Sequence, residues 1–202
     1  MMRKVILVMA GAVCLLIAVA AVFVLTQRSE RPAQTAALNI DGADIGGPFT
    51  LVDHTGVERT SSEVITGPAL IYFGYTYCPD VCPVDTQVMV DVVDVLAEKG
   101  RDVTPVFITV DPARDDVESM QEWAEIMHPK MVAMTGSEDQ IAEAAAAYKA
   151  YYQKVETESE ADYLMNHSAY FYLVDPEGLK AVYRRGFDPE LIAADVAWAL
   201  DQ

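Results

Sequence analysis

Two runs of residues without a charged side chain, at 69–75 and 103–110, constrain the fold of this chain more than any other feature. Each run is short and rich in β-branched and aromatic residues, which is typical of a strand buried on both faces of a sheet. Between them, residues 84–99 carry apolar side chains at helical spacing and are followed by Gly100, a frequent helix terminator. Because strands that alternate with helices form parallel sheets, we expect a parallel core.

Turn and capping signals place the remaining elements. Ser137 and Gln140 have the spacing of a capping box, and Asp188 followed by Pro189 is typical of the start of a helix. Residues 156–166 are acidic and irregular, so we expect a loop there. The predicted strands lie at 49–52, 57–60, 131–134, 151–155, 168–174 and 179–184, and the further helices at 117–127, 138–148 and 189–200. This order predicts an α/β sandwich in which an antiparallel hairpin completes a mixed central sheet.

The N-terminal region has no charged residue from position 5 to position 26. About 20 apolar helical residues are enough to cross a bilayer. Arg3 and Lys4 precede the run, and such basic residues favour retention of that end in the cytoplasm. A cleaved signal peptide has a shorter apolar region, and Cys14 lacks the small preceding residue of a lipoprotein signal. We therefore expect a signal-anchor transmembrane helix over 1–26, a tether over 27–46 and an exported domain over 47–202.

The charge balance and the cysteine content exclude two classes of protein. The chain has 31 acidic and 14 basic residues, for a net charge of −17. Sequence-independent nucleic-acid binding depends on Lys and Arg, so no nucleic-acid partner is expected. Three cysteines do not make the disulfide framework of a small secreted protein. Because Cys14 lies in the apolar run, the exported part has a single pair of cysteines.

That pair, Cys78 and Cys82, lies four residues apart where the first buried strand gives way to the helix. On a helix such residues share a face, with Cβ atoms about 5–6 Å apart, which suits two thiolates on one metal ion. A helix N-terminus also lowers the pKa of a thiol. A plain stabilising disulfide is the alternative, although so short a loop removes little chain entropy.

Two thiolates need a further ligand, and the exported part offers His54, His128 and His167. Structural zinc usually takes four Cys or His ligands, whereas two soft thiolates with one imidazole better fit copper. His167 is favoured because it follows the irregular segment, and loops often carry functional residues. His54 in a turn and His128 at a helix end remain alternatives. Met165 is kept as a weak copper neighbour, and the other methionines of the exported part as core residues.

Three motifs in this order resemble the Sco/SenC family: YFGYTYCPDVCP at 72–83, TVDPARD at 109–115 and DYLMNHS at 162–168. The similarity runs from about residue 45 to the C-terminus. Members of that family are membrane-anchored copper-binding proteins with a thioredoxin-like fold, so the resemblance implies that fold and a bound copper ion. The ligands that it implies are Cys78, Cys82 and His167.

The resemblance further implies a metallochaperone that delivers copper to the binuclear copper centre of cytochrome c oxidase. Its partner is then the copper-receiving subunit of the oxidase. Its location is the inner membrane, with a single span and the domain on the periplasmic or intermembrane-space side. The alternative is a thiol-disulfide oxidoreductase that acts on the cysteines of that subunit, cycling Cys78 and Cys82 with a thioredoxin-like reductant. Three intervening residues, in place of the usual two, count against this enzyme. A copper or redox sensor is a third hypothesis.

The motif at 109–115 also has a plain structural explanation. Val-Asp-Pro after a buried strand is typical of a turn, and Asp115 or Asp116 is suited to cap the following helix. By the family resemblance, the same loop lies near the metal site and helps to shape a partner surface.

Overall fold

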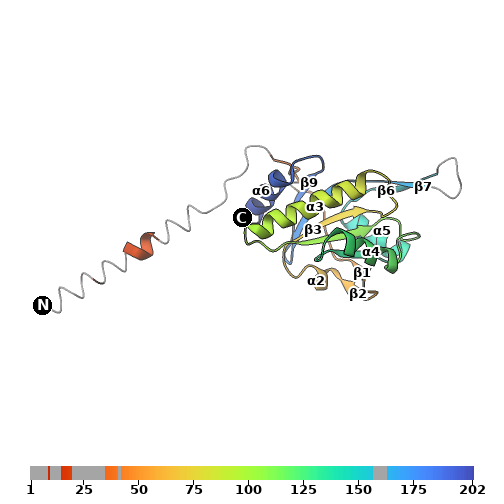
Figure 1. Ribbon diagram of the computed structural model, residues 1–202, viewed down its shortest axis with the longest axis horizontal. Helices are drawn as coiled ribbons and strands as arrows, with labels where there is room; N and C mark the ends of the chain where they lie inside the picture. The colour runs from red at the N-terminus through yellow and green to blue at the C-terminus, as the bar shows by residue number, and fades with distance from the viewer. Residues whose placement is uncertain (1–8, 10–14, 20–34, 41, 157–162) are drawn as a thin grey trace.

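Figure 1 shows a computed structural model of the chain, which describes residues 9, 15–19, 35–40, 42–156 and 163–202. Its centre is a seven-stranded sheet in the order β2-β1-β5-β4-β3-β8-β9, and β6 pairs with β7 in a separate two-stranded sheet. The strands are β1 (Thr50–Asp53), β2 (Glu58–Thr60), β3 (Ala69–Gly74), β4 (Thr104–Thr109), β5 (Val132–Thr135), β6 (Tyr152–Glu156), β7 (Tyr163–His167), β8 (Tyr170–Asp175) and β9 (Gly178–Arg184). The helices are α2 (Ser61–Val64), α3 (Val81–Glu98), α4 (Val117–Met127), α5 (Glu138–Ala147) and α6 (Pro189–Leu200).

The central sheet is mixed, as predicted. β3, β4 and β5 are parallel because each is joined to the next by a helix, α3 or α4. β8 pairs antiparallel with β3 and β9 antiparallel with β8, while β1 pairs antiparallel with β5. All six residues of β3 are buried, which confirms the prediction of a strand covered on both faces.

Alternating side chains of β3 identify the two layers of helices. Tyr72 faces α3, because its hydroxyl donates a hydrogen bond to Asp85 on that helix. The next side chain, Phe73, points to the opposite face, where its ring contacts Tyr148 at the end of α5. α3 packs against both α4 and α6, so these three helices cover one face of the sheet (Figure 1). The resulting α/β sandwich places the core on both sides of β3.

α3 begins at Val81, three residues before the predicted start. Pro83 lies in its first turn, where the missing N–H of proline removes no hydrogen bond of the helix. Cys82 is therefore a helical residue, whereas the sequence prediction left it in the preceding loop. The short helix α2 was not predicted; its N-cap Thr60 and Glu63 form a capping box.

The prediction of a loop over 156–166 is wrong at its C-terminal end, where residues Tyr163–His167 form β7. Tyr163, Met165 and His167 are half-buried, while Leu164 and Asn166 are exposed. Leu164 is apolar but exposed, and His167 is polar but half-buried. The segment therefore lacks the alternation of apolar and polar residues by which a strand is usually predicted. β8 accordingly begins at Tyr170, two residues after the predicted start.

The segment expected as a tether packs on the domain from residue 35 onward. Leu38 donates a backbone hydrogen bond to Val182 on β9, and Arg184 donates one to Ala36. Ala36 is buried, and its N–H donates to the carboxylate of Asp195 on α6 at 2.7 Å. We call residues 35–40 the strap, because they fasten the N-terminal side of the domain to β9 and α6.

Most of the predicted transmembrane segment, 1–26, lies outside the described residues. Residues 15–19 are helical. Within the described ranges, no helix combines the length and the apolar composition needed to cross a membrane. The predicted span therefore stays a prediction.

Candidate metal centre

Three segments meet where the parallel strand β3 ends and α3 begins. Cys78 lies in the loop after β3, Cys82 in the first turn of α3, and His167 at the end of β7. Figure 1 shows the β6–β7 hairpin beside this end of α3, at the side of the domain away from the C-terminus. The carboxyl ends of parallel strands are frequent binding sites, because loops and helix N-termini converge there.

The closest approach between candidate ligands joins Cys82 and His167. The Sγ atom of Cys82 lies 3.1 Å from Nε2 of His167, and Nδ1 of the same ring lies 3.0 Å from the carbonyl oxygen of Ser168. A carbonyl only accepts, so Nδ1 carries the proton and Nε2 of the neutral ring presents its lone pair to the cysteine. Burial lowers the pKa of His167, which favours this neutral form. The ring is thus oriented as a metal-binding imidazole is, with its second nitrogen fixed by a carbonyl.

The two cysteines lie in different environments. Cys82 is fully buried, and burial raises the pKa of its thiol. Cys78 is half-buried, and its Sγ accepts the backbone N–H of Cys82 at 3.4 Å. Burial opposes ionisation there too, but N–H groups of Cys82, Asp80 and Val81 together hold the pKa of Cys78 below its ordinary value. The start of α3 therefore stabilises a thiolate at the more accessible cysteine.

Two tyrosine rings hold the imidazole of His167 edge-on. The ring of Tyr72 lies 6.0 Å from it at 87°, and the ring of Tyr75 lies 5.9 Å away at 89°. Tyr72 lies in β3 and Tyr75 directly follows that strand, and both side chains are buried. Burial raises the pKa of Tyr75 to about 12, so its ring contributes no negative charge to the site near neutral pH.

The buried carboxylate of Asp85 holds Tyr72, one of the two tyrosines that contact the imidazole. Asp85 accepts the hydroxyl of Tyr72 at 3.0 Å and the Nε–H of Arg185 at 2.8 Å. Sequence reasoning missed Asp85, Tyr72 and Arg185. A signal was available for the first of these, since Asp85 has the spacing of the buried face of α3, at Met89 and Leu96. A carboxylate on an apolar helix face indicates a buried partner.

The motif at 109–115 is tied directly to the cysteine loop. Asp115 is fully buried and accepts hydrogen bonds from the backbone N–H and the hydroxyl of Thr76, and from the hydroxyl of Thr109. Asp116, and not Asp115, caps the following helix: it is the N-cap of α4 and accepts the N–H of Ser119 at 2.9 Å. Asp115 therefore anchors the loop that carries Cys78.

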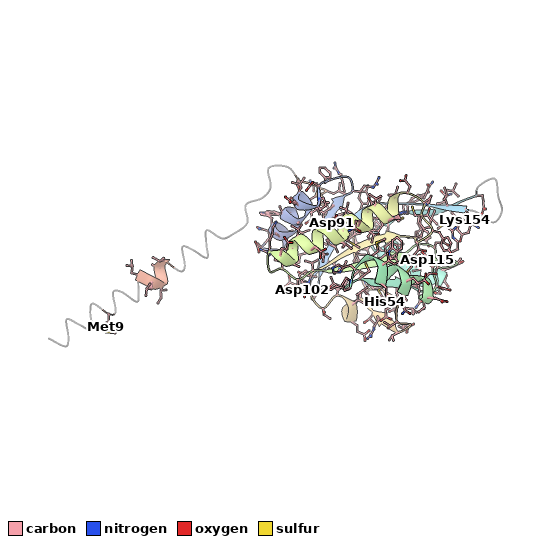
Figure 2. The ribbon with its side chains drawn as sticks, in the orientation of Figure 1. Met9, His54, Asp91, Asp102, Asp115 and Lys154 are labelled. Atoms are coloured by element: carbon pink, nitrogen blue, oxygen red, sulfur yellow. The ribbon has the colours of Figure 1, made fainter. Side chains whose placement is uncertain are left out.

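The other histidines have partners elsewhere. Nδ1 of His54 accepts the backbone N–H of Ala133, and Figure 2 shows His54 apart from the β6–β7 hairpin that Lys154 marks. His128 follows α4 and its Nε2 lies 3.3 Å from Asp94. Met165 shares the inward face of β7 with His167 and packs against the core. Of the three histidines, the structure brings only His167 to a cysteine.

The donor set suits a soft metal ion, because two sulfur atoms and one imidazole nitrogen are ligands that copper(I) prefers. Among the residues that the structure describes, no three Cys, His, Asp or Glu side chains already stand in a metal-coordinating group. Cys82 and His167 face each other, while the thiol of Cys78 is turned toward the backbone of α3. The three candidate ligands are therefore neighbours that do not yet form a coordinating group.

The chain is similar to known proteins over most of its length. A family model described as SCO1/SenC matches residues 38–201. Protein SenC of Rhodobacter capsulatus is 48% identical over 160 residues, which cover 79% of this chain and 72% of that protein.

Two solved structures extend the comparison. The crystal structure of Arabidopsis thaliana ScoI with copper bound has a TM-score of 0.73 and 37% identity, covering 77% of this chain and 98% of the other. BsSco, described as a member of the Sco family of cytochrome c oxidase assembly proteins and as having a disulfide switch, has a TM-score of 0.60 and 25% identity, covering 78% and 94%. These matches confirm the thioredoxin-like α/β fold with a mixed sheet. The chain belongs to the SCO1/SenC family.

Proposed function

We propose that this chain binds copper(I) through the thiolates of Cys78 and Cys82 and the Nε2 atom of His167. The observation that carries the proposal is the 3.1 Å contact between Cys82 Sγ and His167 Nε2, in a ring whose other nitrogen is bound to a carbonyl. Copper replaces the thiol proton in this contact, and the Cys78 thiolate rotates from the start of α3 to become the third donor. The copper bound to the Arabidopsis relative supports the choice of metal.

Delivery is the second part of the proposal. Three soft donors leave copper(I) with an open side, so a partner's cysteines and histidines can displace the ligands one at a time. The recipient is the copper-receiving subunit of cytochrome c oxidase, where the ion enters the binuclear copper centre. The description of BsSco as an oxidase assembly protein supports this recipient. An N-terminal helix holds the domain at the inner membrane, on the periplasmic or intermembrane-space side.

The copper proposal is tested by anaerobic loading of the reduced full-length protein. We expect His167→Ala to weaken copper(I) binding and to remove the nitrogen ligand from the X-ray absorption spectrum. His128→Ala is the matched control, because that histidine lies at a helix end with Asp94 as its neighbour. Equal copper affinity in wild type and His167→Ala would exclude this ligand set.

The asymmetry of the cysteines supports a second candidate function, thiol-disulfide exchange. The Cys78 thiolate attacks a disulfide of the oxidase subunit, forms a mixed disulfide and releases one substrate thiolate. Cys82, whose proton passes to the substrate thiolate released in the first step, then attacks Cys78 Sγ and releases the second thiolate, which leaves a Cys78–Cys82 disulfide. The substrate gains two electrons, and a thioredoxin-like dithiol must reduce the pair again.

The two functions respond differently to the same variants. Reductase activity needs both cysteines but not the imidazole, so Cys82→Ser abolishes it and His167→Ala leaves it largely intact. Copper binding depends on all three residues. Suppose that His167→Ala changes neither copper binding nor reductase activity, while Cys78→Ser and Cys82→Ser each abolish reduction of a disulfide peptide. The protein is then an oxidoreductase and not a copper carrier.

A further inference from the structure

The β6–β7 hairpin, which carries His167, is not part of the central sheet. β6 and β7 pair only with each other, from Tyr152 opposite His167 to Glu156 opposite Tyr163. At its base, the N–H of Ser168 donates to the carbonyl of Tyr151, and the N–H of Tyr151 donates to the hydroxyl of Ser168. With no ladder to the seven strands, the hairpin is held over the cysteines by its connection to β8, by its own side chains Tyr152 and Met165, which pack against the core, and by side chains that reach it from the body of the domain.

Arg114, in the loop between β4 and α4, makes the most extensive of these contacts. Its Nη1 donates to the backbone carbonyl of Tyr163 at 3.1 Å, and its guanidinium lies 3.6 Å from the centre of the Tyr163 ring. Its Nε donates to Asp111, and that carboxylate also accepts the Tyr163 hydroxyl at 2.7 Å. One planar group therefore contacts β7 through its backbone, its ring and a shared carboxylate.

The same guanidinium reaches the cysteine loop. It lies 5.0 Å from the ring centre of Tyr77 and 5.7 Å from that of Tyr75, the residues just before Cys78. The next residue in the chain, Asp115, holds Thr76 by its backbone and its hydroxyl. Figure 2 places Asp115, which belongs to the β4–α4 loop, in the body of the domain and Lys154 out on the hairpin. Arg114 is thus in contact with both segments that bear candidate ligands.

We propose that Arg114 is a positioning residue for the metal centre, which clamps β7 against the cysteine loop so that His167 meets Cys82. This inference rests on the proposed copper function. Tyr163 and His167 lie on the same face of β7, four residues or about 13 Å apart along a strand. Because β7 is paired with β6, a shift at one end of the strand moves the other end as well. Holding Tyr163 in place therefore also fixes the direction from which the imidazole of His167 approaches Cys82.

The chemistry of arginine explains the choice of this side chain. Asp111 and the Tyr163 carbonyl are acceptors on different edges of one plane, while the Tyr163 ring lies over its face. A guanidinium serves all three at once, whereas a lysine ammonium is a single point that cannot stack. Arg114→Lys keeps the charge and Arg114→Gln removes it, so the pair separates the effect of geometry from that of charge.

The test measures copper(I) affinity of the reduced full-length protein by competition with a chelator. We expect Arg114→Gln to weaken binding roughly 10- to 100-fold, as for other residues that orient a metal ligand, and Arg114→Lys to restore only part of it. In a His167→Ala background, Arg114→Gln should cause no further weakening, because the clamp acts through that imidazole. Arg101→Gln is the control, since Arg101 forms a comparable ion pair with Asp201 on the opposite side of the chain's fold.

A second readout needs no metal. The imidazole ¹⁵N signals of the reduced metal-free protein report whether Nδ1 carries the proton and Nε2 faces a thiol. We expect Arg114→Gln and Tyr163→Leu to shift these signals toward those of a solvent-exposed histidine, and Arg101→Gln to leave them in place. If wild type binds no copper, the proposed function fails while these spectra still decide the clamp. Unchanged spectra, or equal weakening in the presence and absence of His167, overturn the role of Arg114. If Arg114→Gln does not fold, Arg114→Lys and Tyr163→Leu decide the same question.

Discussion

Asp53, the last residue of β1 before the turn to β2, is a carboxylate that the fold keeps ionised. Only 7% of the residue is exposed, and burial alone would raise its pKa. The hydroxyl of Thr55, the N–H of Val57 and the guanidinium of Arg59 all donate to it, and together they lower the pKa of Asp53 to about 2. Through these contacts, Asp53 is an electrostatic anchor for the β1–β2 hairpin.

This anchor predicts a dependence of stability on pH. A carboxyl group whose pKa is lower in the folded than in the unfolded chain stabilises the fold above about pH 4, and the effect is lost as pH falls toward 2. Between pH 5 and pH 3, we expect the free energy of unfolding of wild type to fall by about 1 kcal/mol more than that of Asp53→Asn. Urea unfolding at the two pH values measures the difference. Parallel losses in both proteins would mean that Asp53 has an ordinary pKa.

At the scale of single residues, the sequence named chemically reactive groups more readily than the groups that hold them. Cys78, Cys82 and His167 stand out because few residue types bind soft metals. Tyr72, Asp85 and Arg114 are common residues whose contacts bridge distant parts of the chain. The spacing of Asp85 on α3 indicates that it is buried, but no spacing within one segment identifies the partners, which are defined only when the strands and helices pack together.

The first residues of α4, α5 and α6 were predicted correctly from local sequence patterns. Ser137 is the N-cap of α5: its hydroxyl accepts the N–H of Gln140, and its own backbone N–H donates to the side-chain oxygen of Gln140, as the capping-box spacing predicts. Asp188 likewise caps α6 with Pro189 in the first turn. β7 was missed because its partner β6 and its covering side chains, rather than its own alternation, determine that it is a strand.

The cap of α5 gives a prediction at the level of one element. Ser137→Ala removes the acceptor for the Gln140 N–H, so we expect a loss of about 1 kcal/mol in the free energy of unfolding. Glu143→Ala, at an exposed position of the same helix, should change stability by less than about 0.5 kcal/mol. Chemical denaturation of both variants checks the comparison. A Ser137→Ala protein as stable as Glu143→Ala would show that the cap contributes nothing.

At the scale of the whole molecule, the strap joins the two ends of the described domain. Asp195 on α6 is 3% exposed and accepts both the hydroxyl of Thr35 and the N–H of Ala36. Composition alone predicted a tether through this region, because its contacts are made with β9 and α6, near the other end of the sequence. The strap begins beside α6, and Figure 1 shows α6 on the opposite side of the domain from the β6–β7 hairpin.

The strap predicts a stability coupling between the chain's two ends. Asp195→Ala leaves the buried Ala36 N–H without an acceptor, and we expect it to lower the free energy of unfolding by about 2 kcal/mol. Hydrogen exchange should accelerate at the Leu38 and Arg184 amides, which form the bonds between strap and β9. Glu98→Ala, at the exposed end of α3, serves as the control and should alter neither. Protected Leu38 and Arg184 amides in Asp195→Ala would show that the strap docks without this carboxylate.

Residue order alone predicts the alternation of buried strands and helices, the mixed sheet, the starts of α4, α5 and α6, and a cysteine pair with three candidate histidines. These follow from side-chain periodicity and from residue chemistry, both of which are local properties. The folded chain is needed to show that His167 rather than His54 or His128 faces a cysteine, that residues 35–40 are docked, and that Arg114 contacts both the hairpin and the cysteine loop. The physical reason is that contacts between residues far apart in the chain arise when apolar surfaces pack, and packing depends on the whole fold rather than on any one segment.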